Sequence, residues 1–175
     1  IQAVGDRCFE EQLFEAARIL FQNINNYAKL ASTFIKLGKN REAVNAATKA
    51  NSTKTWKEVL FACVDAKDFK YAQTCGLNII MQADELDDLI SYYETRGHWE
   101  ELVDLLEKGL GLERAHMGIF TSLGILYAKY KPEKMMEHIT RYYRRAHIPK
   151  LLHACEVNHL WAEMRFLYTH HEEYD

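Results

Sequence analysis

Residues 93–102, Tyr-Glu-Thr-Arg-Gly-His-Trp-Glu-Glu-Leu, read as the turn of a helical hairpin. Trp99 lies six places after Tyr93, and Leu102 lies nine places after it. A short polar segment that contains a glycine separates Tyr93 from Trp99. Residues 63–72, Cys-Val-Asp-Ala-Lys-Asp-Phe-Lys-Tyr-Ala, have the same form, with Phe and Ala at those two places. An aromatic or apolar position kept in phase with a small or apolar one is typical of helices that pack as hairpins.

The same phase recurs along the whole chain. Its six starting positions are Cys8, Ile35, Cys63, Tyr93, Tyr127 and Cys155. Successive starts are 27, 28, 30, 34 and 28 residues apart, which is the length of two short helices and two turns. A repeat of this length predicts an all-α solenoid of stacked antiparallel helical hairpins.

The position six places after each start is aromatic in four repeats. These residues are Phe14, Phe69, Trp99 and Trp161. We expect each of these rings to open its helix and to pack under the previous hairpin, since one hairpin cannot bury its own apolar face.

Composition agrees with an elongated helical scaffold. The chain is 48% hydrophobic and 27% charged, and it has only 2 proline and 8 glycine residues, so it can form long helices around a continuous core. The net charge of −3 argues against a general nucleic-acid binder, which needs a broad basic surface. No apolar run reaches the roughly 20 residues that span a bilayer, and no signal peptide opens the chain, so we expect a cytoplasmic protein.

The pattern predicts about twelve helices in one continuous domain over residues 1–175. There is no linker or low-complexity tract, and both ends look like cuts through a longer repeat array. Pro132 and Pro149 are expected at helix starts, where proline costs no hydrogen bond, and the helix that begins at Pro132 is expected to run to Arg145.

Nothing in the sequence predicts catalysis, a cofactor or a metal. There is no Gly-x-Ser-x-Gly turn, no glycine-rich phosphate loop and no His-Glu-x-x-His motif. His147, His153 and His159 lie near Cys155 but at spacings that place them on different faces, so we expect no zinc site. The four cysteines form no Cys-x-x-Cys pair, and three of them share one repeat position, which predicts reduced thiols in the core.

Charge is segmented along the chain. Residues 84–107 contain nine acidic residues against one basic residue, whereas residues 129–150 contain seven basic residues against two acidic ones. These segments are either solvated outer faces, or the second is a docking stripe for an acidic helix of a partner protein. On the second interpretation, the candidate partner-binding residues are Lys129, Lys131, Lys134 and Arg141.

Several strings of the chain resemble the clathrin heavy chain family. They are Asn-Ser-Thr-Lys-Thr-Trp-Lys-Glu-Val at 51–59, Phe-Ala-Cys-Val-Asp at 61–65, Gly-Leu-Glu-Arg-Ala-His-Met-Gly at 111–118 and His-Leu-Trp-Ala-Glu at 159–163. Shorter strings at 83–86 and 148–150 extend the resemblance over essentially all 175 residues. A generic helical repeat would share the period but not these sequence strings.

The resemblance implies a segment of the proximal leg, close to the hub where three heavy chains join. Legs of this family are right-handed stacks of helical hairpins that interleave into the lattice of coated vesicles. The implied role is therefore a structural coat component in vesicle traffic and endocytosis, at the cytoplasmic face of coated pits and coated vesicles. The implied partners are the clathrin light chain and other heavy-chain legs, with membrane association only through the coat.

The resemblance also singles out Lys129. Residues 126–134 match the family stretch that includes a lysine used in light-chain binding. The sequence departs from the family at two places. Gln82 occupies a position where the family usually has a histidine considered a pH sensor. Residues 141–147 carry more positive charge than the usual family sequence at these positions. We therefore expect no pH sensor at Gln82.

Two other classes of scaffold share the architecture. A peptide-binding module of the tetratricopeptide kind would show a Trp-Leu-Gly-Tyr pattern at a 34-residue period, which is missing here. A different membrane-tethering or coat scaffold would share the repeat without the string at 111–118.

Overall fold

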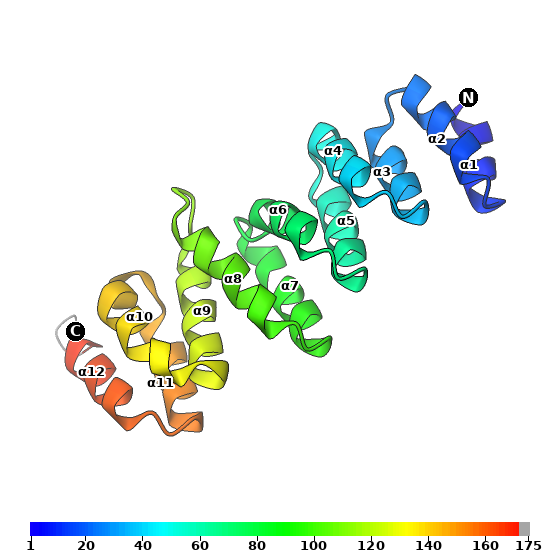
Figure 1. Ribbon diagram of the computed structural model, residues 1–175. Helices are drawn as coiled ribbons and strands as arrows, with labels where there is room; N and C mark the ends of the chain where they lie inside the picture. The colour runs from blue at the N-terminus through cyan, green and yellow to red at the C-terminus, as the bar shows by residue number, and fades with distance from the viewer. Residues whose placement is uncertain (172–175) are drawn as a thin grey trace. The chain divides into compact units, whose positions relative to one another are not determined.

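The computed structural model describes residues 1–171, and these residues form helices joined by short turns (Figure 1). Their contacts divide the chain into two compact units, Ile1–Ile79 and a second unit that begins at Ile80. The helices of the first unit are α1 (Gln2–Glu10), α2 (Phe14–Asn23), α3 (Tyr27–Lys36), α4 (Asn40–Ala50), α5 (Thr53–Asp65) and α6 (Phe69–Ile79).

The second unit has six further α-helices and two 3-10 turns within the described residues. They are α7 (Ala83–Thr95), α8 (Trp99–Leu110), α9 (Met117–Tyr130), η1 (Pro132–Lys134), α10 (Met135–Tyr142), η2 (Tyr143–Arg145), α11 (Ile148–Val157) and α12 (Trp161–His171). Within residues 1–171 there is no β-strand, which confirms the all-α fold and the predicted number of helices. In that same part of the chain, no helix is both long enough and apolar enough to cross a bilayer.

Inside each unit the helices pack as stacked hairpins. Helices that follow each other in sequence contact each other, as α3 and α4 or α5 and α6 do, and several also contact a helix two positions along, as in α3 with α5 and α9 with α11. Alanines let helices approach closely in the first unit: Ala43, Ala46 and Ala47 of α4 are buried. In the second unit, α9 touches α7, α8, α10 and α11, so its apolar sequence is covered on several sides.

The repeat phase corresponds to a defined helix ending. Four of the starting residues, Cys8, Cys63, Tyr93 and Cys155, accept a hydrogen bond at their carbonyl from the backbone N–H five places on, at 2.8 to 3.0 Å. The residue before that donor has a left-handed backbone, with φ of 74° at Gly97. This is the geometry by which a left-handed residue closes the last turn of a helix. The recurring sequence pattern is therefore a recurring helix stop.

The aromatic repeat position is covered in one place and open in another. The indole of Trp99 stacks on the ring of Tyr130, with centroids 4.7 Å apart and planes 3° apart. Trp161 is 62% exposed and lies near His159, so the expectation that it packs under the previous hairpin is wrong. The Trp99 indole is covered by Tyr130 at the end of α9, so its cover comes from a later helix and not from the previous hairpin, whereas the ring beside Trp161 is His159 of the turn before α12.

Two further expectations compare with the structure as follows. The helix predicted from Pro132 to Arg145 is broken into η1, α10 and η2, so its regular part is only Met135–Tyr142. The cysteines are free thiols; Cys63, Cys75 and Cys155 are buried, which confirms the core position, and Cys8 is half-buried. Burial raises the pKa of the Cys63 and Cys155 thiols to about 11, so both stay protonated at neutral pH.

Candidate protein-interaction site

The four predicted basic residues lie on or beside the same two helices. Lys129 is in the last turn of α9, Lys131 follows α9 directly, Lys134 ends η1, and Arg141 is in the last turn of α10. Pro132 at the start of η1 turns the chain here, so that the lysines flank the connection between α9 and α10. We call these four residues the basic face.

Lys129 is paired within its own chain. Its Nζ donates to Glu94 Oε1 at 3.1 Å, and the Tyr130 hydroxyl donates to the same oxygen at 3.2 Å. Hydrogen bonds with Tyr130 and Glu94 raise the pKa of Lys129 above its ordinary value. The ammonium is about half exposed, so it stays charged while one intrachain carboxylate holds it.

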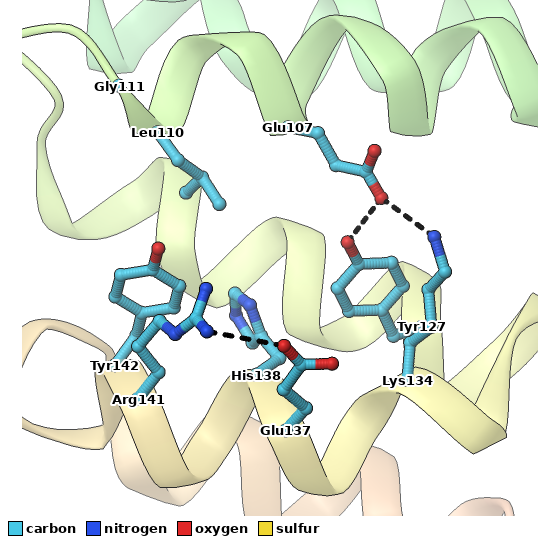
Figure 2. A pocket seen from close by; sticks show the side chains of 9 residues that line it. All are labelled: Glu107, Leu110, Gly111, Tyr127, Lys134, Glu137, His138, Arg141 and Tyr142. Carbon is cyan, nitrogen blue, oxygen red and sulfur yellow. Dashed lines mark hydrogen bonds and ion pairs between the residues drawn. The ribbon is translucent and has the colours of Figure 1, made fainter.

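Lys134 is held by a second carboxylate, at the edge of a pocket between α8, α9 and α10 (Figure 2). Glu107 Oε1 accepts hydrogen bonds from the Tyr127 hydroxyl at 2.5 Å and from Lys134 Nζ at 3.3 Å. Burial opposes ionisation of Glu107, but these two hydrogen bonds outweigh it, and the pKa of this carboxyl falls below its ordinary value. Glu107 is therefore ionised, and its negative charge already lies beside Lys134 of the basic face.

Arg141 and Lys131 are engaged more loosely. Arg141 lines the same pocket, and its Nη2 donates to Glu137 Oε1 at 3.3 Å across one turn of α10 (Figure 2). Both side chains are well exposed, and exposed pairs of this kind add little stability. Lys131 Nζ lies 5.9 Å from the centre of the Trp99 ring, within the range of a cation–π contact.

The floor of the pocket is a buried histidine that the sequence did not single out. His138 is 5% exposed, and its Nε2 lies 2.8 Å from the Phe120 carbonyl oxygen, a geometry in which the ring N–H donates. Its ring lies 5.3 Å from those of Tyr127 and Tyr142. Burial lowers the pKa of His138, so the ring is neutral at pH 7 and acts as part of the core.

A second pocket, of about 610 Å³, lies beside Lys129 between α9 and α11. Apolar atoms make up most of its lining, and its residues include Ile125, Val157, Lys150 and His153. Val157 is 61% exposed although it is aliphatic. Lys129 thus borders an apolar groove as well as belonging to the basic face, and this groove was not visible in the charge pattern.

The structure therefore places Lys134 and Arg141 at one pocket and Lys129 at another, with partners that the sequence did not pair. The acidic and basic segments meet through Glu94 and Lys129 and through Glu107 and Lys134, whose partners are 35 and 27 positions apart in the sequence. Their opposite charge was the only available signal, and it did not specify which residues meet.

Comparison with known proteins assigns the chain to a family. A family model described as "Region in Clathrin and VPS" matches residues 1–71 and 77–175. Over all 175 residues the chain is 57% identical to clathrin heavy chain 2 of Homo sapiens, 58% to probable clathrin heavy chain 1 of Caenorhabditis elegans and 56% to the clathrin heavy chain of Dictyostelium discoideum. It spans 10 to 11% of the length of these relatives. By sequence, this chain belongs to the clathrin heavy chain family.

Proposed function

We propose that this chain is a proximal-leg segment of a clathrin-type heavy chain, a structural component of the coat on the cytoplasmic face of coated pits and coated vesicles. Identity above 55% along the whole chain supports this role. The segment acts as one continuous piece of a longer right-handed α-solenoid, in which stacked hairpins give stiffness and side faces for contact. Its partners in this role are other heavy-chain legs, three of which join in the full-length protein, and it has no catalytic activity of its own.

We further propose that the basic face binds the clathrin light chain. The observation that carries this proposal is the position of Lys129, which borders the apolar groove between α9 and α11 and also belongs to the basic face. An amphipathic helix recognises such a surface by placing apolar side chains in the groove and acidic side chains against the lysines at its edge. Lys150, which also lines the groove, supplies a second cation there.

The intrachain carboxylates set the strength of this contact. Glu94 and Glu107 neutralise part of the charge of Lys129 and Lys134 before a partner arrives. An incoming acidic helix therefore shares or displaces these carboxylates, and the net electrostatic gain comes mainly from orientation and association rate.

Charge reversal at Lys129 tests the proposal. Binding of purified cognate light chain to the 175-residue chain is measured by titration calorimetry for wild type, Lys129→Glu and Lys54→Glu. Lys54 is an exposed residue of α5 and serves as a control with the same change in net charge. We expect Lys129→Glu to weaken binding at least about tenfold, because a like charge then faces the acidic partner.

The salt dependence adds a second measurement. Wild-type binding should weaken as salt rises, because charges more than about 8 Å apart are screened at physiological ionic strength. If Lys129→Glu binds as tightly as Lys54→Glu while circular dichroism shows both folded, Lys129 is not a light-chain contact.

A further inference from the structure

A polar pocket of about 530 Å³ lies in the first unit, where α2, α3 and α4 meet, and it has no part in the site described above. Its lining residues combine amides, two opposite charges and an apolar floor. They are Gln22, Asn23, Asn25, Tyr27, Leu30, Phe34, Glu42, Asn45, Ala46 and Lys49.

Two of the amides are oriented by residues that are near in the sequence. The Tyr27 hydroxyl donates to Asn25 Oδ1 at 3.2 Å, and Arg18 Nη1 donates to Gln22 Oε1 at 3.4 Å. Both bonds use the amide oxygen, so the N–H groups of these two side chains remain as donors for a ligand. The pocket therefore favours a ligand that presents carbonyl acceptors.

The charges of the pocket stand on one face of α4. Glu42, Asn45 and Lys49 follow each other at helical spacing, and all three are exposed. The Lys49 ammonium lies 5.3 Å from the centre of the Tyr27 ring, which restrains its position. Glu42 and Lys49 are seven residues apart, a rise of about 10.5 Å along the helix. The pocket thus has a negative pole at Glu42, a positive pole at Lys49 and amides between them.

We propose that this pocket binds an extended peptide segment of a partner protein, in which an acidic and a basic residue stand three positions apart with an apolar residue between them. In a polyproline-II strand, residues i and i+3 lie on the same side and about 9.3 Å apart, close to the separation of the two poles. The acidic residue pairs with Lys49 and the basic residue with Glu42. The apolar residue lies over Leu30, Phe34 and Ala46.

The amides favour an extended partner over a helical one. A polyproline-II strand has no internal hydrogen bonds, so its carbonyls are open to the donors of Asn25 and Gln22. A helix also presents charges seven residues apart at this distance, but it has already used its own carbonyls. The peptide backbone therefore supplies acceptors for these two donors, and the two charges set its direction.

The probe is a fluorescein-labelled peptide with the core Glu-Pro-Leu-Lys, titrated with the 175-residue chain and followed by fluorescence anisotropy. The control peptide, Glu-Pro-Lys-Leu, has the same composition but a charge spacing of two. A second control is a helical peptide with its acid and base seven residues apart. We expect the first peptide to bind at least about tenfold more tightly than either control, since only it aligns both charges with the open amides.

Charge exchange identifies the poles. Lys49→Glu should lose the Glu-Pro-Leu-Lys peptide and bind Lys-Pro-Leu-Lys instead, because the groove then has two negative poles. Lys54→Glu, outside the pocket, should leave the preference of the wild type unchanged. Equal binding of the three peptides, tighter binding of the helical one, no binding at millimolar concentration, or failure of Lys49→Glu to exchange its preference overturns the proposal. Lys49 is exposed, so the folded state of the variant is checked by circular dichroism and then compared directly.

Discussion

At the scale of single residues, the same repeat position has different energetic weight in different hairpins. Trp99 is half-buried against Tyr130, whereas Trp161 is 62% exposed. We expect Trp99→Ala to lower the free energy of unfolding by about 2 kcal/mol, from lost burial and lost ring stacking. Trp161→Ala should change it by less than about 0.5 kcal/mol, as exposed substitutions generally do.

Urea denaturation of the two variants, followed by circular dichroism, measures this difference. A loss at Trp161 equal to that at Trp99 would mean that Trp161 is covered in solution. The comparison tests the packing of each site, since both substitutions remove the same side chain from the first residue of a helix.

We expect His138 to make the stability of the second unit sensitive to pH. Burial lowers its pKa in the folded state, so the unfolded chain takes up a proton more readily. The contribution of neutral His138 to the free energy of unfolding is therefore fully present above the unfolded pKa of about 6.5. It is lost as the pH falls through that value towards the lower folded pKa. The groups around the ring are Tyr127, Tyr142 and the Phe120 carbonyl, and the charge of Glu107 partly offsets the effect of burial.

We expect the free energy of unfolding to drop less between pH 7.5 and pH 5.5 in His138→Gln than in wild type. The control is His153→Gln, because His153 is exposed on α11. Denaturant titrations at the two pH values give the difference for each protein. An identical drop in wild type and His138→Gln would show that His138 does not titrate between the folded and unfolded states in this range.

At the scale of elements, α9 depends on a glycine where it meets its neighbours. A Cβ at Gly124 would lie 2.5 Å from Leu151 Cδ2 of α11 and 3.3 Å from His138 Cδ2 of α10. Leu151 and His138 are both buried, so neither moves away without disturbing its own packing. Gly124→Ala should therefore cost about 1 to 3 kcal/mol, as overpacked cores do.

Gly111→Ala, at the C-terminal end of α8, is the matched control. At Gly111 the nearest heavy atom to an added Cβ is the Lys108 carbonyl oxygen at 3.7 Å, and φ is −78°, which alanine adopts freely. We expect Gly111→Ala to be neutral or to stabilise the protein by about 0.4 to 1 kcal/mol, because alanine lowers the conformational entropy of the unfolded chain. Thermal unfolding of both variants measures the two effects, and equal melting temperatures would contradict close contact between α9 and α11.

At the scale of the whole molecule, the acidic segment restrains the surface proposed for the light chain. Glu94 and Glu107 hold Lys129 and Lys134 through hydrogen bonds at 3.1 and 3.3 Å. Replacing both carboxylates by Gln keeps the shapes and removes the competing charges. We expect Glu94→Gln with Glu107→Gln to bind light chain about threefold or more tightly than wild type, since like-charge opposition to the partner is reduced.

The control for this double variant is Glu100→Gln with Asp104→Asn, which changes the net charge by the same amount. Both residues are exposed on α8, the helix that carries Glu107. Calorimetry with the same light chain compares the two. Binding unchanged by the first pair would show that the carboxylates do not compete, and tighter binding with the second pair would assign the effect to net charge alone.

Much of this protein follows from its sequence. The all-α class, the number of helices and the hairpin turns were predicted because they depend on local features: apolar spacing along each helix and a helix ending that recurs once per hairpin, every 27 to 34 positions. The four basic residues were visible for the same reason, since charge is a property of each residue. Resemblance of short strings indicated the family before any geometry was available.

Other features depend on which helix surfaces meet, and only the tertiary structure decided them. The pairing of Glu94 with Lys129 and of Glu107 with Lys134 joins residues 35 and 27 positions apart, and the spacing of charges in the sequence does not determine such contacts. The exposure of Trp161 likewise depends on what covers it and not on its phase in the repeat. Local periodicity determines where a helix begins and which face is apolar, whereas packing between helices determines which side chain covers it.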